Sequence, residues 1–249
     1  MLYDIACMDL KHNSEIIGDY RRKTIDQYLD YGEKLVQLDV NLIVFVQNSE
    51  INHKLADLGK KYGKKNMVMI AKPFEMFKWH DQLPFIRIND IANPIEGRSK
   101  IKDTEFYRVC VWEKFECLKQ AMTANPFRST HFGWIDFGVS YRTTWPSNMN
   151  QIVNSFNDKV KVTLLSPTGE RDVYRLQKAR VDAGFFTGCL KNMFQLVERF
   201  EKELKRVLVH DTRAPMEETI MYELINKYPG DYLISWSMMY ERLFTHYLL

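Results

Sequence analysis

The sequence of 249 residues has only four cysteines and no long apolar run. The cysteines are Cys7, Cys110, Cys117 and Cys189. They form no C-x-x-C pair and have no histidines at zinc-site spacing, so we expect them to pack as small apolar side chains in a reducing compartment. No apolar run reaches the roughly 18–20 residues that span a bilayer, and Asp4 stands where a signal peptide carries positive charge. These absences predict a cytoplasmic protein and leave attachment to a membrane surface open.

An excess of either charge is also missing. Lys and Arg number 35 against 32 Asp and Glu, which gives a formal net charge of +3. The basic stretches 20–23 and 98–102 are short, and short basic runs are typical of solvated surface. A nucleic-acid partner, which would need a strongly basic surface, is therefore not expected.

Linkers, repeats and low-complexity segments are absent as well. The apolar fraction of 45% and the charged fraction of 27% are those of a globular protein. A chain of this length buries a core without disulfide or metal staples. We predict one domain over residues 1–249.

Strand-like and helix-like segments alternate along the chain. Short apolar or β-branched runs predict strands at Leu2–Met8, Asn41–Val46, Lys64–Ala71, Thr130–Phe137 and Lys159–Leu165. Helical spacing predicts helices at Asp19–Leu38, Ser49–Lys61, Asp103–Ala124, from Gly184–Gly188 to Val209, and at Pro215–Tyr228. The stretch 74–102 shows no clear period, and the tail 231–249 is rich in aromatic residues. This alternation predicts an α/β fold with a mostly parallel sheet, in which ligands lie beyond the carboxyl ends of the strands.

The segment Trp112–Gly138 carries the clearest chemical signal. A long predicted helix, an Asn125-Pro126 turn and an apolar strand lead to one carboxylate, Asp136, followed by Gly138. A carboxylate at the end of a strand can coordinate a divalent cation or accept a ribose hydroxyl. The alternative is that Asp136 caps a turn.

Several short motifs together resemble the bacterial HtrL/YibB-like (WlaTC/HtrL) family, which is related to glycosyltransferases of the GT-A fold. They are Trp112-x-Lys114-Phe115, Asn125-Pro126-Phe127, Trp134-Ile135-Asp136-Phe137-Gly138, Arg21 with Tyr28, Gly184–Gly188, Glu217-Glu218 and Tyr228-Pro229. The resemblance implies a GT-A-like three-layer α/β/α domain with a central mostly parallel sheet. Its Rossmann-like half, about residues 1–140, would bind a nucleotide sugar, and about residues 141–249 would bind the acceptor.

The activity that the resemblance implies is transfer of a sugar from a nucleoside-diphosphate sugar, with UDP expected, to a hydroxyl of a glycan acceptor. Mn²⁺ or Mg²⁺ would assist, with Asp136 holding metal and donor. The usual D-x-D motif has two carboxylates, and Trp134 occupies the place of one of them, which puts metal dependence in question. His246 is a candidate second metal ligand; the alternative is a structural histidine among tail aromatics.

Two cations are expected to assist at the donor. Arg21 falls on the helical face of Ile25 and Tyr28, near a helix start where phosphates bind. Lys114 matches the family's Trp-x-Lys motif and would touch the donor. For each, the alternative is an ion pair with a neighbouring acid.

The acceptor side offers three acids. Pro215 followed by Glu217 and Glu218 is by itself good chemistry for a helix start. The resemblance implies that, in an inverting enzyme, an acid at this helix start deprotonates the acceptor hydroxyl. Glu218 is the first choice, Glu217 the second, and Asp182 is a further acid that can face the acceptor. A retaining reaction needs no base there.

The five residues Gly184–Gly188 place two glycines around aromatic residues at an expected strand-to-helix junction. Glycine lets the backbone approach a sugar, so Gly188 is a candidate for donor binding; the alternative is an ordinary turn into the helix. A second function class is a non-catalytic glycan- or nucleotide-binding module. The missing second aspartate favours it, and the remaining acids and glycines weigh against it.

Overall fold

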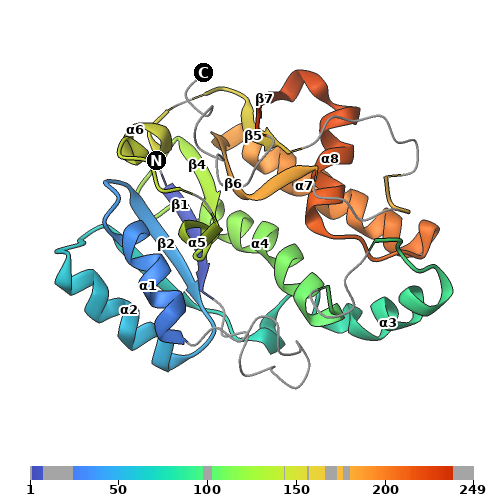
Figure 1. The fold of residues 1–249 in the computed structure, drawn as a ribbon, viewed down its shortest axis with the longest axis horizontal. Helices are drawn as coiled ribbons and strands as arrows, with labels where there is room; N and C mark the ends of the chain where they lie inside the picture. The colour runs from blue at the N-terminus through green and yellow to red at the C-terminus, as the bar shows by residue number, and fades with distance from the viewer. Residues whose placement is uncertain are drawn as a thin grey trace.

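A single mixed sheet forms the centre of the protein. The computed structural model describes residues 2–7, 25–97, 103–142, 144–155, 157–165, 173–175 and 180–237. Its strands are β1 (Leu2–Cys7), β2 (Asn41–Val46), β3 (Met67–Ala71), β4 (His131–Ile135), β5 (Val160–Leu164), β6 (Val181–Cys189) and β7 (Tyr232–Trp236). They lie in the order β3-β2-β1-β4-β6-β5-β7, so the sheet runs without a break through both halves of the chain (Figure 1).

Strand direction brings the ends of most strands to one edge of this sheet. β1 pairs in parallel with β2 and β4, β2 pairs in parallel with β3, and β5 with β7. Only β6, among the strands described, runs against its neighbours β4 and β5. The carboxyl ends of the other strands therefore meet the amino end of β6 at one edge, which we call the carboxyl edge.

Helices cover both faces of the sheet (Figure 1). The α-helices are α1 (Ile25–Val36), α2 (Ser49–Lys61), α3 (Leu83–Ala92), α4 (Glu105–Ala124), α5 (Val139–Arg142), α6 (Met149–Val153), α7 (Leu190–Arg206) and α8 (Glu217–Lys227). Short 3₁₀ turns lie at Phe74–Met76, His80–Gln82 and Pro229–Asp231, and one π-helical turn lies at Val207–Asp211. The predicted three-layer α/β/α fold with a mostly parallel sheet is confirmed.

Two apolar clusters form the core, one on each face. β2 shows why: Ile43 and Phe45 belong to the cluster under α4, α7 and α8, whereas Leu42 and Val44 belong to the cluster under α1, α2 and α6. Successive residues of a strand point to opposite faces, so a strand covered by helices on both sides is apolar at every position. This accounts for the continuous apolar run that β2 presents.

Helix α4 packs on one face of the sheet, where it contacts the central strands β1 and β4. Thr104 caps its start by accepting a hydrogen bond from the Tyr107 amide at 3.3 Å. It ends at Asn125, whose φ of 35° is left-handed and whose side chain accepts from the Ser129 amide at 2.7 Å. That turn directs the chain into β4.

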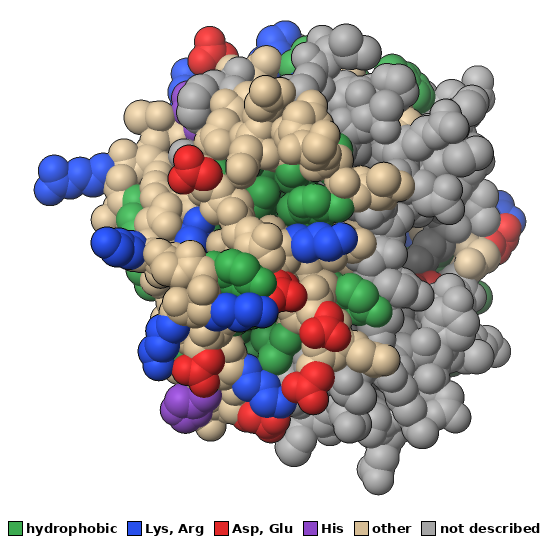
Figure 2. Space-filling model, turned by 60° about the vertical axis from the view of Figure 1, so that its left-hand side comes forward, with side chains coloured by type: hydrophobic (Ala, Val, Ile, Leu, Met, Phe, Trp, Pro, Cys, Tyr) green, Lys and Arg blue, Asp and Glu red, His purple; other side chains and the backbone are tan. Residues whose placement is uncertain are grey.

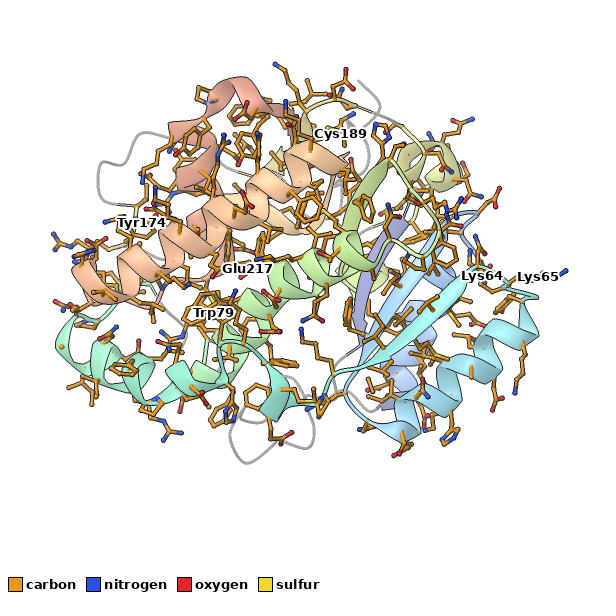
Figure 3. All side chains as sticks on the ribbon, turned by 180° about the vertical axis from the view of Figure 1, so that it is seen from behind. Lys64, Lys65, Trp79, Tyr174, Cys189 and Glu217 are labelled. Carbon is orange, nitrogen blue, oxygen red and sulfur yellow. The ribbon has the colours of Figure 1, made fainter. Side chains whose placement is uncertain are left out.

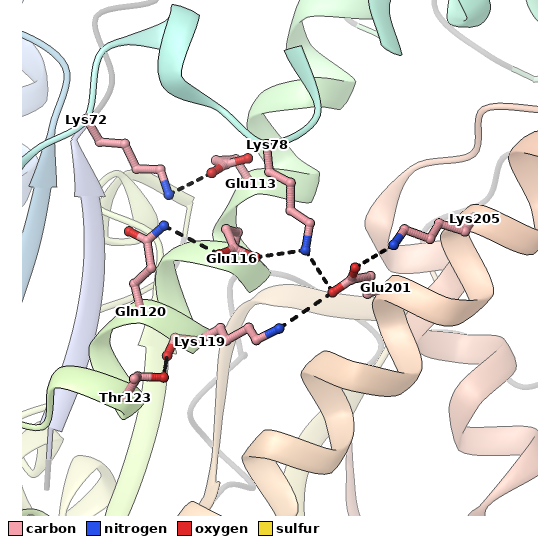
Figure 4. A network of polar contacts seen from close by, with 9 residues as sticks. All are labelled: Lys72, Lys78, Glu113, Glu116, Lys119, Gln120, Thr123, Glu201 and Lys205. Atoms are coloured by element: carbon pink, nitrogen blue, oxygen red, sulfur yellow. Dashed lines mark hydrogen bonds and ion pairs between the residues drawn. The ribbon is translucent and has the colours of Figure 1, made fainter. Parts of the chain in front are cut away.

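Charged side chains tie α4 to α7 and to the segment after β3 (Figure 4). Lys78 reaches Glu116 at 3.1 Å and Glu201 at 2.8 Å, and Lys205 contacts Glu201 at 2.7 Å. Although partial burial opposes it, the hydrogen bonds from Lys205 and Lys78 lower the pKa of Glu201 to about 2. One turn earlier on α4, the buried Glu113 pairs with Lys72 at 2.7 Å.

The surface over α1 and α2 mixes both signs of charge (Figure 2). Lys54 pairs with Asp26 at 2.7 Å, and Lys61 pairs with Glu33 at 2.6 Å. Lysines and acids therefore alternate over the described part of this face. The basic stretches 20–23 and 98–102 lie outside the described residues.

Two expectations about local structure were wrong. The stretch 74–102 contains helix α3; strand β7, in the tail, was not predicted. Residues 184–188 do not form a turn into a helix but lie inside β6, and α7 begins at Leu190. Within the described part of the chain, no helix is both long and apolar enough to cross a membrane. Cys110 and Cys117 are buried.

Candidate functional site

Asp136 lies directly after β4, at the carboxyl edge. Its amide donates to the Gly184 carbonyl at 2.8 Å, which continues the β4–β6 ladder by one residue. Its carboxylate accepts from the Trp134 indole N–H, with 2.6 Å between Nε1 and Oδ1. Because 39% of the Asp136 side chain remains exposed, the carboxylate is oriented by the strand and still reachable from solvent.

Lys114 reaches this carboxylate from α4. Its Nζ lies 3.3 Å from Asp136 Oδ1, 2.9 Å from Glu217 Oε1 and 3.1 Å from the Ala183 carbonyl. Lys114 is only 3% exposed. Burial by itself would lower the pKa of Lys114, but the nearby charges of Asp136 and Glu217 raise that pKa above its usual range. Lys114 is therefore an ammonium held between two carboxylates that favour its charged form.

Glu217 is the first residue of α8 and points back toward α4 (Figure 3). It is 4% exposed, and its Oε2 is buried without a hydrogen-bond donor. A buried acceptor without a donor loses the hydrogen bonds it makes in water, so the burial of this oxygen costs free energy. Glu218 follows it on α8, is partly exposed, and is not among the three acceptors of Lys114.

Asp182 approaches Asp136 from β6 across Gly184. Asp182 Oδ1 accepts from the Gly184 amide at 2.6 Å. A Cβ placed on Gly184 would lie 2.9 Å from Asp182 Oδ1 and 3.3 Å from Asp136 Oδ2. The absence of a side chain at Gly184 thus leaves room for two carboxylates to lie side by side.

The start of α8 is fixed by the first half of α4. Trp112 Nε1 donates to the Pro215 carbonyl at 2.9 Å, and Arg108 donates to the Ala214 carbonyl at 2.8 Å. Arg108 also forms a two-pronged ion pair with Asp90 of α3 and is fully buried. Trp112, Lys114 and Glu217 are therefore parts of one rigid connection between the two helices.

A divalent cation at this edge would have to be held by few protein ligands. Three carboxylates (Asp136, Asp182 and Glu217) accompany one ammonium (Lys114), so an anionic ligand needs added positive charge there. Mg²⁺ is commonly held by one or two carboxylates together with substrate phosphates. Neither Trp134 nor Gly138, the residues two positions from Asp136, offers an oxygen ligand, and the described residues contain no cluster of three or more His, Cys, Asp or Glu suited to a metal. Asp136, with Asp182, would hold the ion.

The structure brings Asp136, Lys114, Asp182 and Glu217 together, with Glu218 next in the chain. Gly188 is not part of this group: it pairs with Phe132 toward the opposite edge, and a Cβ there would meet Met193 and the Lys159 carbonyl. Arg21 and His246 lie outside the described residues.

Sequence reasoning missed two contributors. The indole N–H of Trp134 orients Asp136, and Arg108 fixes the loop before α8. A signal for Trp134 was available, because position 134 shares its strand face with position 136. Nothing in the sequence pairs Arg108 with residue 214, since the two are joined only by the tertiary fold.

A sequence model of the family described as "bacterial protein of unknown function (HtrL_YibB)" matches residues 17–240. The chain therefore belongs to the HtrL_YibB family, as its motifs predict. Among solved structures it is similar to the apo crystal structure of mouse xyloside xylosyltransferase 1, with 7% sequence identity and a TM-score of 0.48. That match covers 94% of this chain and 84% of the other. No curated protein matches the sequence.

Proposed function

We propose that this protein is a glycosyltransferase that takes a sugar from a nucleoside-diphosphate sugar, with UDP as the expected nucleotide, and transfers it to a hydroxyl of a glycan. The observation that carries the proposal is the carboxyl edge itself. There a strand-end carboxylate, Asp136, faces Asp182 across Gly184 and is joined to Glu217 through Lys114. Ligands of parallel α/β sheets bind at this edge.

On the donor side, Asp136 is the group that meets the diphosphate and its cation. A bound Mn²⁺ or Mg²⁺ supplies positive charge that stabilises the leaving diphosphate. Trp134 and Lys114 hold Oδ1 of Asp136, which leaves Oδ2, the oxygen on the Gly184 side, for that role.

On the acceptor side, the bond from the sugar C1 to the donor phosphate oxygen breaks, and a bond from C1 to the acceptor oxygen forms. In an inverting reaction the hydroxyl proton passes to a carboxylate. Glu217 is a candidate for this role because its Oε2 has no hydrogen-bond donor. Glu218 is a candidate because it is the more accessible of the two. In a retaining reaction both acids bind substrate instead.

The test is thermal unfolding in the presence of ADP, GDP, CDP and UDP, each with Mn²⁺, with Mg²⁺ and with a chelator. A diphosphate at about 100 times its Kd should stabilise the fold by roughly 2.7 kcal/mol. We expect a shift with one diphosphate that requires the metal. Asp136→Asn should abolish this shift and reduce transfer at least about 100-fold, while its melting temperature without ligand stays near that of the wild type.

A non-catalytic binding module is the second candidate, and the lack of a carboxylate at positions 134 and 138 favours it. It predicts glycan or nucleotide binding with no release of sugar from any nucleoside-diphosphate sugar. Failure of every diphosphate to shift the melting temperature would contradict the transferase.

A further inference from the structure

The contacts of Lys114 leave it no free donor. An ammonium group has three N–H bonds, and Lys114 has three acceptors: Asp136 Oδ1, Glu217 Oε1 and the Ala183 carbonyl. The side chain is almost completely buried, so water does not compete for these bonds. A phosphate could reach Lys114 only by breaking one of them.

The backbone around Lys114 is equally fixed. α4 holds the loop before α8 through Trp112 and Arg108, and Asp136 is held by Trp134 and by the ladder to Gly184. The Asp136 carboxylate is therefore anchored by a contact of its own, whereas Glu217 is placed by the fixed loop before α8 and its carboxylate bonds to Lys114. Lys114 itself lies nearer Glu217, at 2.9 Å, than Asp136, at 3.3 Å.

We propose that Lys114 is a positioning residue that couples the two sides of the site, so that the charge of Glu217 controls how strongly Asp136 attracts the cation and diphosphate. This inference rests on the proposed function. While Glu217 is charged, it draws the ammonium away from Asp136, and Asp136 keeps its attraction for a cation. When Glu217 is neutral, the full charge of Lys114 falls on Asp136 and opposes binding of the cation.

The sign of one measurement separates this coupling from a direct effect. A complex of Mn²⁺ with a nucleoside diphosphate is anionic, so removing the Glu217 charge should strengthen its binding if the two act only through space. Coupling through Lys114 predicts the opposite. In Glu217→Gln we expect the Kd to rise about fivefold or more, which is the range of ordinary allosteric couplings.

The experiment is a calorimetric titration in which a nucleoside diphosphate is added to the protein in the presence of Mn²⁺. The diphosphate is the one among ADP, GDP, CDP and UDP that most stabilises the wild type. The proteins are wild type, Glu217→Gln, Lys114→Met and the double variant. We expect Glu217→Gln to weaken binding in the wild-type background and to change the Kd by less than about twofold, or to strengthen binding, in the Lys114→Met background. Glu203→Gln is the matched control, because Glu203 is a buried carboxylate that accepts from Lys227 of α8 at 2.9 Å; it should leave the Kd unchanged.

Unchanged or tighter binding by a folded Glu217→Gln would overturn the coupling and leave the proposed function standing. This arm decides even where Lys114→Met fails to fold. The same loss of affinity in both backgrounds would also overturn it, since the effect would then bypass Lys114. Absence of binding by the wild type to all four diphosphates would overturn both the coupling and the proposed function.

Discussion

At the scale of single residues, the site depends on the absence of a side chain at Gly184. Gly184 lies between two carboxylates, and a methyl group there would meet Asp182 Oδ1 at 2.9 Å. Contacts under 3.0 Å force a neighbour to move, and the neighbours here are the proposed cation ligands. We expect Gly184→Ala to fold and to bind the metal–diphosphate complex about tenfold more weakly, because displaced ligands lose coordination geometry.

Gly230→Ala is the natural comparison, since nothing lies within 4 Å of a Cβ at that position. Titration calorimetry of both variants measures the effect. Equal affinities in the two variants would show that Asp182 and Asp136 do not act together on the ligand.

A second residue with a clear consequence is Glu203 of α7. Partial burial would raise its pKa, but hydrogen bonds from Arg206, Lys227 and Tyr174 lower the pKa of Glu203 to about 2. A carboxyl with a lowered pKa in the folded state stabilises the fold above its ordinary pKa of 4.5, and this contribution is lost as the pH falls from there toward 2. We expect Glu203→Gln to lose roughly 2 kcal/mol of unfolding free energy at pH 7 and much less near pH 2.5.

Urea unfolding at the two pH values measures this difference. Glu198→Gln, on an exposed position of the same helix, should change stability by less than about 0.5 kcal/mol at either pH. A loss for Glu203→Gln that is the same at both pH values would mean that its ionisation does not support the fold.

At the scale of elements, α4 fixes the start of α8, a helix far away in sequence. Fully buried Arg108 bonds to Asp90 and to the Ala214 carbonyl, three residues before Glu217. Removing one partner of a buried ion pair leaves the other charge uncompensated, and such changes cost about 3–5 kcal/mol. We expect Arg108→Met to lose that much unfolding free energy in urea.

Arg87→Met provides the comparison for this arginine, because Arg87 pairs with Glu105 at 2.8 Å while remaining 58% exposed. Exposed pairs contribute about 1 kcal/mol or less. A loss for Arg108→Met no larger than that of Arg87→Met would show that the α3–α4–α8 junction does not depend on this ion pair.

The elements also show how far sequence reasoning reaches. β2 and α2 were predicted at their observed bounds, because β2 is apolar after Asn41 and Ser49 can begin a helix; the observed cap is its neighbour Asn48. α3 was missed because Phe85, Ile88 and Ile91 are exposed to solvent. Its apolar residues therefore do not repeat at the spacing of a buried helix face. The glycines of β6 suggested a turn, whereas pairing with β4 and β5 holds them extended.

In the site, too, local patterns were predictable and long-range contacts were not. Placing Asp136 at a strand end needs only the local pattern, and that pattern predicted it. The contact of Lys114 with Glu217 joins residues 103 positions apart. Such contacts depend on strand order and on the packing of α4 against α8, which no local pattern encodes. Sequence reasoning therefore named the acids but not the lysine contact that connects them.

At the scale of the whole molecule, the proposed donor half (about residues 1–140) and the proposed acceptor half (about residues 141–249) share one sheet and one helix. β4 belongs to the first half and pairs directly with β6 of the second, and α4 contacts β1, β4, α7 and α8. Two halves that share a strand ladder and a core helix are not expected to unfold independently of each other. We therefore predict a single cooperative unfolding transition, seen at the same temperature by far-ultraviolet circular dichroism and by tryptophan fluorescence.

Two variants on opposite sides sharpen this prediction. In Gly32→Ala a Cβ on α1 would lie 1.8 Å from the Phe137 ring, which must move and disturb the donor-side core. Glu203→Gln weakens the acceptor side, between α7 and α8. If the halves are coupled through β4–β6 and α4, each variant lowers the temperature of the one shared transition and leaves it single. Splitting into two transitions, with Gly32→Ala moving only one of them, would show that the halves are separate folding units and that the site lies at their junction.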